Sequence, residues 1–278
     1  MAKDKLVQPF LKWAGGKRQL INAIEKYIPN IDDINTYYEP FLGGGAVLFH
    51  LQPKKAVIND LNADLINTYE VIRDNVDELI EDLKKHKNTP EYYYEIRNWD
   101  RNSDFKNLSK IKKASRLIYL NKTCYNKLFR VNSNGEFNTP FGYYKKPNIV
   151  NEDVLRAVSK YLNENDITLL NCDFEIALKD IKPGDFVYLD PPYYPLSNTS
   201  NFTSYTFDGF SENDHVRLKK LCDQLTKKGI KFLLSNSSAP FIIELYKDYK
   251  LEFVKARRSI NSNGDGRGQV KEVLVRNY

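Results

Sequence analysis

The chain has 278 residues, of which 41% are hydrophobic and 28% charged, a balance that is ordinary for a globular protein. Its formal net charge is +6, its start has no apolar stretch that could serve as a signal peptide, and no segment approaches membrane-spanning length. The three cysteines and three histidines are too widely spaced for a disulfide framework or a metal site. We therefore expect an intracellular, cytoplasmic protein with no bound metal and no membrane segment.

The chain begins with a strand–helix–strand pattern. Residues 36–41 (TYYEPF) predict a short strand, and the glycines that follow lead into a small helical pattern. Residues 54–60 (KKAVIND) predict a second strand that ends on Asp60. From residue 63 the apolar residues recur at helical spacing with a break near Asp74, which indicates two helices.

Residues 63–147 read as a mainly helical insert. A helix is expected over 109–122, and Asn134-Gly135 lies between two β-like flanks, which is typical of a hairpin. Residues 106–146 contain ten basic residues and one acid, a local charge of +9, whereas the remaining 32 basic and 35 acidic residues sum to −3. Aromatic and Asn side chains are interleaved with this charge, which favours a nucleic-acid surface over a solvated face.

Helix and strand patterns alternate again from residue 151 to the end. The expected helices cover 151–163, 211–229 (with a capping-box-like Ser211 and Asp214) and 239–248, and a short helix precedes the strand over 185–190. The other expected strands cover 167–173, 230–236, 251–260 and 270–278.

This order of elements predicts an α/β fold with a doubly wound, mostly parallel, Rossmann-like sheet. The last two strands flank a glycine-rich loop and are expected to form a terminal antiparallel hairpin. Two strands precede the insert and the others follow it, so residues 1–62 and 148–278 would form one discontinuous domain and residues 63–147 a second one. Ligands of such sheets bind at the carboxyl ends of the strands.

Three of these carboxyl ends carry residues that suit a nucleoside ligand. The turn Phe41–Gly45 follows the first strand, and its glycines allow close approach to the backbone, although GxGxxG is absent. Asp60 ends the second strand, where an acid could hold ribose hydroxyls or simply cap the strand. Asp173 and Phe174 end the third, where they could surround an adenine or form an ordinary turn.

The fourth strand ends in Asp190-Pro191-Pro192-Tyr193. The two prolines cannot donate ladder hydrogen bonds, so the strand must stop there. The residues alone leave two interpretations open. Either this is a polar turn, or a carboxylate and an aromatic face are held rigidly at the open end of the sheet.

Six segments resemble the Dam-type (DpnM-like) DNA adenine-N6 methyltransferases that modify GATC, in the same order and over nearly the whole chain. They are FLKWAGGKRQL (10–20), EPFLGGGAVLF (39–49), VINDLNADLI (57–66), YNKLFRVNSNGEFNTPFG (125–142), NCDF (171–174) and LDPPYYPLS (189–197). The resemblance implies a methyltransferase domain that is interrupted by a target-recognition domain.

The resemblance also implies a cofactor, S-adenosyl-L-methionine, and the residues that bind it. Trp13 and Lys17 would approach the cofactor, Asp60 would hold its ribose, and Asp190 would border it. The turn containing Phe41, Gly43 and Gly45 would surround the methionine moiety, with Asp173 and Phe174 at the adenine end.

The same likeness gives the turn after the fourth strand a catalytic role. The Asp190 carboxylate and the Pro191 carbonyl would accept the two hydrogens of the adenine amino group, so that its nitrogen lone pair points at the methyl group. Tyr193 would stack on the flipped base, with Pro192 keeping acid and ring at a fixed separation. Transfer would be direct and in line, without a covalent enzyme intermediate.

Target reading would belong to the insert. Arg130 is the expected guanine reader because a guanidinium can donate to both O6 and N7. By resemblance, Lys12 would reach the first guanine, Tyr125 would lie near the flipped base, and Asn126, Leu128 and Pro140 would contact other bases. Lys127 departs from the family, which implies a glycine there. Residues 197–207 are expected to be a flap that orders on DNA.

The expected partner is duplex DNA containing GATC, bound by an enzyme that is monomeric or only weakly self-associating and that can belong to a restriction-modification system. The rival interpretations are a catalytically silent DNA-binding module, a cytosine-N4 or RNA-adenine methyltransferase, and an NAD-dependent oxidoreductase. The absence of GxGxxG counts against the last of these.

Overall fold

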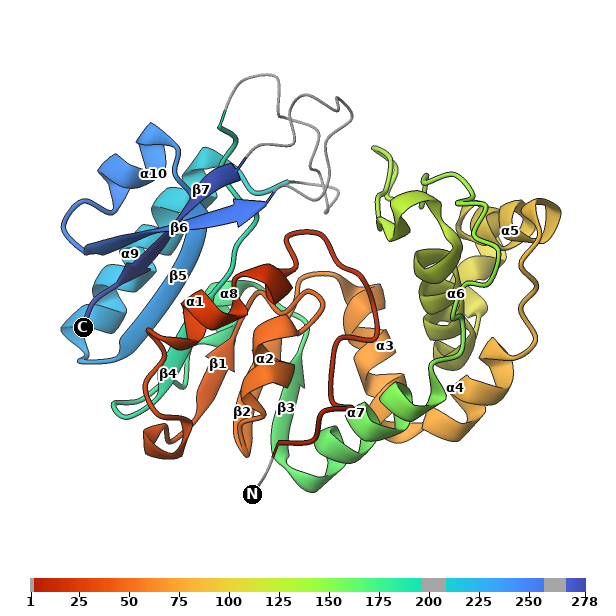
Figure 1. The fold of residues 1–278 in the computed structure, drawn as a ribbon, viewed down its shortest axis with the longest axis horizontal. Helices are drawn as coiled ribbons and strands as arrows, with labels where there is room; N and C mark the ends of the chain where they lie inside the picture. Colours follow the sequence, from red (N-terminus) through yellow and green to blue (C-terminus); the bar gives the residue numbers. More distant parts are fainter. Residues whose placement is uncertain (1–2, 197–208, 258–268) are drawn as a thin grey trace.

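The computed structural model describes residues 3–196, 209–257 and 269–278, and within them seven strands form a central sheet (Figure 1). In chain order the strands are β1 (Tyr37–Glu39), β2 (Lys55–Asn59), β3 (Asp166–Leu170), β4 (Phe186–Leu189), β5 (Lys231–Ser237), β6 (Lys250–Arg257) and β7 (Gln269–Arg276). Their spatial order is β3-β2-β1-β4-β5-β7-β6. The pairs among β1 to β5 are parallel, whereas β7 is antiparallel to both β5 and β6. The predicted mostly parallel sheet with a terminal antiparallel hairpin is confirmed.

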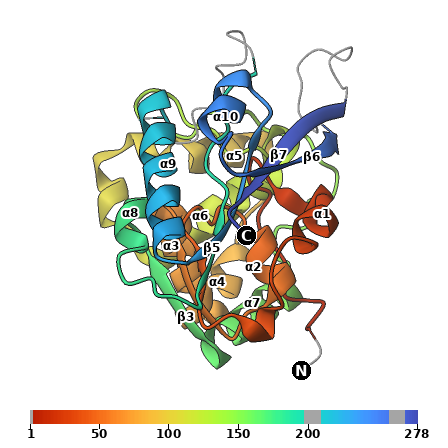
Figure 2. The ribbon, with the colours of Figure 1, turned by 90° about the vertical axis from the view of Figure 1, so that its left-hand side faces the viewer.

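Helices cover both faces of this sheet (Figure 2). One face packs against α8 (Phe174–Ala177), α9 (Glu212–Lys227) and α10 (Pro240–Leu245), and the other against α1 (Ile21–Glu25), α2 (Ala46–Leu51) and α7 (Glu152–Glu164). Successive strand residues point to opposite faces, so Leu233 and Leu234 enter different apolar clusters. A strand buried on both faces reads as a continuous apolar run, as the central strands of this sequence do.

A second group of helices lies beside the sheet (Figure 1). It comprises α3 (Ala63–Asp74), α4 (Val76–Leu83), α5 (Pro90–Arg97) and α6 (Lys110–Thr123). The predicted break between the first two helices is confirmed at Asn75, whose N–H closes the last turn of α3 before α4 begins. Ser109 caps α6 by accepting a hydrogen bond from the amide of Lys112.

Helix α5 was not predicted. Its start is nonetheless encoded locally, because the Thr89 hydroxyl accepts a hydrogen bond from the amide of Tyr92 and Pro90 occupies the first turn. Two 3-10 turns, Asn98–Arg101 and Ser103–Asn107, connect α5 to α6. None of the described helices has the length and apolar character that crossing a membrane requires.

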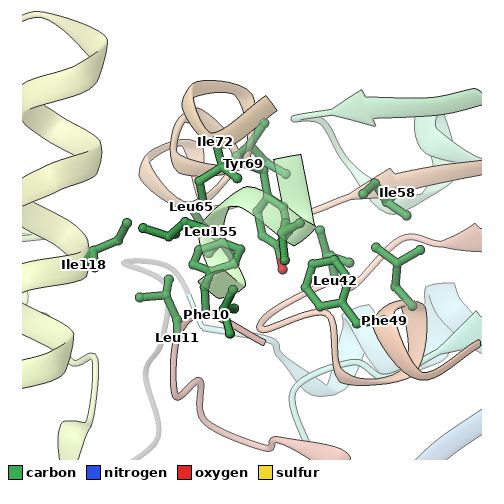
Figure 3. Packing of buried hydrophobic residues seen from close by; sticks show 14 of the residues in the cluster. Phe10, Leu11, Leu42, Phe49, Ile58, Leu65, Tyr69, Ile72, Ile118 and Leu155 are labelled. Carbon is green, nitrogen blue, oxygen red and sulfur yellow. The ribbon is translucent and has the colours of Figure 1, made fainter. Parts of the chain in front are cut away.

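One apolar cluster continues from the sheet into the second group of helices (Figure 3). Ile118 of α6, Leu65 of α3 and Leu155 of α7 belong to the same cluster as Ile58 of β2. The N-terminal segment joins it through Phe10, whose ring meets that of Tyr69 edge-on with centroids 4.9 Å apart. The helical group is therefore held to the sheet by a shared core.

Several elements end earlier than predicted. Strand β1 stops at Glu39 because Pro40 has no amide hydrogen to donate. Strand β3 stops at Leu170, after which the amide of Cys172 bonds to the side chain of Asn59 and leaves the ladder. The predicted flap (197–207) and most of the glycine-rich loop between β6 and β7 lie outside the described residues.

The basic hairpin differs from its prediction. Two isolated antiparallel bridges, Cys124–Phe141 and Val131–Phe137, replace a continuous ladder. The tip is a turn at Asn134-Gly135, as predicted, where the Asn132 side chain accepts hydrogen bonds from the amides of residues 134 and 136. This side chain satisfies backbone donors that a regular hairpin would pair across its strands.

Candidate active site

The carboxyl ends of the parallel strands are tied to one another by Asn59, which sequence reasoning missed. This fully buried residue at the end of β2 donates to the carbonyls of Pro40 and Cys172, both at 3.0 Å, and accepts from the amide of Cys172 at 2.9 Å. One side chain therefore aligns the turns that follow β1 and β3. Its partner lies 113 residues away in the sequence, so no local pattern could indicate the contact.

The glycine turn after β1 is closely packed and requires glycine. Gly43 and Gly45 have φ values of +50° and +66°. A Cβ on Gly43 would lie 3.0 Å from the Trp13 indole, and one on Gly45 would lie 2.7 Å from the Tyr69 hydroxyl. The Cβ positions of both glycines are therefore filled by neighbouring side chains, and Trp13 packs against the turn.

Asp60 is hydrogen-bonded to the glycine turn. Its two carboxylate oxygens accept hydrogen bonds from the amides of Gly43 and Asn62, both at 2.9 Å. Burial raises the pKa of Asp60, and the two amide donors act in the opposite direction. The capping interpretation is thus correct for this residue. Each oxygen keeps a further lone pair, so the carboxylate can also accept from a ligand.

Asp173 and Phe174 begin α8 and contact a residue that the sequence did not indicate. Asp173 caps the helix through the amide of Glu175 and forms an ion pair with Arg217 of α9 at 3.0 Å. The Arg217 guanidinium also lies over the Phe174 ring, 4.9 Å from its centroid. Phe174 is buried and packs against Phe41, with ring centroids 5.4 Å apart, so the predicted cofactor residues from β1 and β3 do converge.

Lys17 meets the acid of the turn after β4. Its ammonium lies 2.9 Å from the Asp190 carboxylate and 4.5 Å from the centroid of the Tyr193 ring, and it donates to the carbonyl of Gly15. Burial raises the pKa of Asp190 to about 6, while Lys17 lowers it and Glu272 raises it further. A buried acid and an aromatic ring therefore face the same cation.

Two further acids at this edge were missed by sequence reasoning. Glu39, which ends β1, is fully buried and accepts a 2.7 Å hydrogen bond from the Tyr37 hydroxyl. Burial raises its pKa to about 8, so Glu39 is mainly protonated at neutral pH. Glu272 of β7 accepts a 2.6 Å hydrogen bond from the Tyr193 hydroxyl. A signal for Glu39 was its position in the EPF segment, whereas the sequence around Glu272 offered none.

The backbone that follows Tyr193 is fastened to β5. The Tyr194 amide donates to the Asn236 side chain at 3.1 Å, and the Ser237 hydroxyl donates to the Tyr194 carbonyl at 2.6 Å. The Tyr194 ring packs against Phe241, with centroids 4.6 Å apart. Pro191 is buried and Pro192 half-buried, so the turn from 190 to 194 is held along its whole length.

Most of the predicted DNA-reading residues of the insert are exposed. Arg130, Tyr125, Asn126 and Pro140 are exposed, and Leu128 is half-buried. The Arg130 guanidinium donates from Nε to the Asn138 side chain at 2.8 Å. Asn126 and Lys127 both have left-handed backbone, with φ values of +57° and +54°, which explains why a glycine would suit position 127.

Lys12 lies next to this hairpin although it is remote in sequence. Its ammonium donates to the carbonyl of Asn126 at 2.9 Å. The buried Asn121 of α6 holds the Lys12 backbone through both its amide (3.0 Å) and its carbonyl (2.8 Å). Trp13 stacks on Phe129 with centroids 4.7 Å apart. The segment that carries Lys12, Trp13 and Lys17 therefore connects the hairpin to the carboxyl edge of the sheet.

The fold, with its antiparallel end strands, is that of the Rossmann-like methyltransferases. The turn from Asp190 to Tyr193 lies at the edge where open α/β sheets bind their ligands. Comparison with known families is more specific, because residues 13–260 match the model of the D12 class N6 adenine-specific DNA methyltransferases. The chain belongs to this family and is an adenine-N6 DNA methyltransferase. The rival interpretations as a silent binding module, an oxidoreductase, or a methyltransferase of cytosine or RNA are thereby set aside.

Curated relatives match the chain over almost its full length. The chain is 46% identical to the Type II methyltransferase M1.LlaDCHI of Lactococcus lactis subsp. cremoris, an alignment that covers 100% of this chain and 98% of that protein. Identity is 43% to the Type II methyltransferase M.MjaIII of Methanocaldococcus jannaschii, over 98% and 99% of the two chains. It is 34% to the DNA adenine methylase of Escherichia coli K12, over 96% and 94%.

Proposed function

We propose that this enzyme transfers a methyl group from S-adenosyl-L-methionine to N6 of the adenine in GATC within duplex DNA. The observation that carries the proposal is the turn after β4, where the buried Asp190 carboxylate and the Tyr193 ring face the same ammonium group, that of Lys17. An acceptor for an amino group and a ring for stacking a base are thus available in one short segment.

The residues around the glycine turn fit S-adenosyl-L-methionine. The left-handed glycines let the turn direct its Gly43 amide to Asp60, whose carboxylate keeps lone pairs for ribose hydroxyls. When bound, this cofactor supplies a methyl group on a positively charged sulfur. The Asp60 and Asp190 carboxylates favour a cationic ligand. We assign the cofactor to Trp13, Lys17, Phe41, Gly43, Gly45, Asp60, Asp173, Phe174 and Asp190.

Asp190 and Pro191 are assigned to the target amino group. The lone pair of an adenine amino nitrogen is delocalised into the ring, which makes this nitrogen a poor nucleophile. If the Asp190 carboxylate and the Pro191 carbonyl accept its two hydrogens, the nitrogen is drawn toward tetrahedral geometry and its lone pair becomes available. A carboxylate whose pKa is raised to about 6 is also a better acceptor for the proton that the nitrogen must lose.

Tyr193 is assigned to the flipped base. An adenine inside the duplex is out of reach of a carboxylate at the edge of a sheet, so the base must swing out by about 180°. Stacking on an aromatic ring is worth roughly 1–3 kcal/mol per base, which offsets part of the cost of unstacking. Pro191 and Pro192 restrict the backbone between Asp190 and Tyr193, which keeps the acid and the ring in register.

Recognition of GATC is assigned to the hairpin and to Lys12. Arg130 is exposed and uses only Nε to bond Asn138, which leaves its two terminal nitrogens for O6 and N7 of a guanine. Lys12 reaches the hairpin from the N-terminal segment. We assign the remaining base contacts to Tyr125, Asn126, Leu128 and Pro140.

We also propose that different ranges of the chain carry out methyl transfer and target recognition. Residues 1–62 and 148–278 would bind the cofactor and carry out the transfer, and residues 63–147 would recognise the target. This division is supported by the sheet, whose strands all come from the first two ranges, and by the exposed basic hairpin in the third.

The test is a panel of duplexes that contain GATC or one of its single-base-pair replacements. Labelled methyl transfer from S-adenosyl-L-methionine should occur on GATC, and each replacement of an outer G·C pair should cost about 1–3 kcal/mol, or roughly 5- to 150-fold in kcat/KM. Methylation of DNA in cells that express the protein should map to the adenine of the same site. Equal rates on all duplexes, or a different preferred site, would overturn the assignment of GATC.

Arg130→Ala in the same panel tests the assignment of the guanine. The variant should lose about 1–3 kcal/mol on GATC and much less on the duplex altered at the recognised guanine, so that discrimination narrows at one position. Arg130→Lys is the matched control, because it keeps the charge but not the fork of donors. A uniform loss over all duplexes would make Arg130 a phosphate contact instead.

A further inference from the structure

Glu272 lies at the same edge of the sheet as the candidate active site because β7 is antiparallel to β5 and β6. In the pairing of β5 with β7, Glu272 is opposite Ser237, the last residue of β5. Residues near the start of an antiparallel strand therefore share an edge with the carboxyl ends of β4 and β5. A parallel strand in this position would carry its corresponding residue at the opposite edge of the sheet.

The carboxylate of Glu272 holds the far end of the Tyr193 side chain. The Tyr193 hydroxyl donates to it at 2.6 Å, within the range of a hydrogen bond between two oxygens. Burial, Asp190 and Glu272 all raise the pKa of Tyr193, so the phenol keeps the proton that it donates. The Tyr193 phenol is therefore the donor in this bond.

The Tyr193 ring is consequently fixed at both ends. The residue that follows it is bonded to Asn236 and Ser237 of β5, which immobilises the backbone. The two side-chain torsions of a tyrosine would still let the ring turn, and a bond at its hydroxyl restricts this motion. The plane of the ring, and hence the plane of any base stacked on it, then depends on Glu272.

We propose that Glu272 is a positioning residue that orients the Tyr193 ring for the target adenine. This inference rests on the proposed function, which assigns Tyr193 to stacking. Glu272 orients the ring through the Tyr193 hydroxyl; it also raises the pKa of Asp190, so the variants are compared above pH 8, where Asp190 is ionised with or without Glu272. Loss of Glu272 should therefore matter only in an enzyme that still has this hydroxyl.

A double-mutant cycle tests this dependence, with Glu272→Ala, Tyr193→Phe and the double variant assayed on whichever duplex the wild type methylates. Glu272→Ala should lower kcat about tenfold and change the KM for cofactor less than about twofold, because the lost bond orients the base. Tyr193→Phe should lower kcat by a similar factor. The double variant should be no slower than either single one.

Glu272→Gln keeps an acceptor oxygen and should recover most of the lost rate, which keeps the test valid if Glu272→Ala folds poorly. Glu252→Gln is the matched control: it removes the same charge from the same hairpin, where Glu252 pairs with Arg276, and should leave kcat unchanged. Effects of Glu272→Ala and Tyr193→Phe that multiply in the double variant would overturn the proposal.

Fluorescence of 2-aminopurine at the target position separates this inference from the proposed function. In the wild type, emission should rise when the base is flipped and be partly quenched by stacking on Tyr193. Glu272→Ala should increase the emission and Glu272→Gln should not. An unchanged spectrum in Glu272→Ala, with flipping intact, would refute the positioning role, whereas no rise in the wild type would refute base flipping itself.

Discussion

Lys17 and Asp190 form an ion pair from which water is largely excluded, because their side chains expose 5% and 17% of their surface. Burial makes the carboxylate costly and raises the pKa of Asp190, and the neighbouring ammonium offsets part of this effect. The resulting pKa of about 6 lies close to the pH at which the enzyme must act. The charge state of one residue therefore limits the range of active pH.

This pKa predicts how activity depends on pH. It lies above the ordinary value for aspartate, so the carboxylate form that can accept hydrogens is lost as the pH falls through about 6. A profile of kcat/KM should show its acid limb near this pH. Lys17→Met should move the limb to higher pH, since Lys17 lowers the pKa of Asp190. A limb that stays in place in this variant would mean that another group titrates.

The short turn Tyr125–Lys127 adopts the backbone conformation that its hydrogen bonds require, even though a lysine disfavours that conformation. The 3-10 turn Tyr125–Lys127 contains two consecutive residues in the left-handed region. The amide of Lys127 donates to the Cys124 carbonyl at 2.9 Å, and the amide of Tyr125 donates to the Pro140 carbonyl at 2.8 Å. These bonds fix the turn, and a residue with a Cβ at position 127 must accept the strain.

Lys127→Gly should therefore stabilise the protein. Glycine tolerates the φ of +54°, so the free energy of unfolding should rise by about 0.5–1 kcal/mol. Lys127→Ala is the control, because it removes the same ammonium from the Tyr144 ring but keeps the Cβ and its strain. Urea denaturation of both variants measures the difference. Equal stabilities for Gly and Ala would show that the left-handed backbone carries little strain.

At the scale of the whole molecule, packed aromatic and glycine residues join the basic hairpin to the glycine turn, to which we assign target recognition and cofactor binding. Phe129 follows Leu128 on the hairpin and packs on Trp13, and the other side of Trp13 lies against the glycine turn. Figure 3 shows the shared apolar core that continues between the same two parts of the chain. A change at the hairpin can therefore alter the wall of the cofactor site.

Phe129→Leu should weaken the binding of S-adenosyl-L-methionine although Phe129 lies in the insert. An aromatic pair contributes about 0.5–1.5 kcal/mol beyond its buried area, which corresponds to a roughly two- to tenfold rise in Kd. Phe137→Leu is the matched control, since Phe137 is equally buried and packs on Phe129. Calorimetric titration of each variant with the cofactor measures the effect. Equal Kd values for the two variants would exclude coupling through Trp13.

The sequence by itself indicated the strands of the sheet, most of the longer helices and some of the residues that end them. Proline after Glu39 and after Asp190 stops β1 and β4, and Ser211 with Asp214 forms the capping box that begins α9. These signals are local, because a missing amide hydrogen or a capping side chain acts within a few residues. The turn after β4 (residues 190–193) and the glycine turn (residues 41–45) could be found in the sequence because their signals are also local.

Only the tertiary structure decided which distant side chains support these turns. Asn59, Arg217 and Glu272 each bond to a predicted site residue or its neighbour from 44 to 113 positions away, and none lies in a pattern that indicates such a partner. Their contacts depend on strand order and register, above all on the antiparallel insertion of β7 between β5 and β6. Strand order is set by how the whole core packs, so local propensity and spacing carry no record of it.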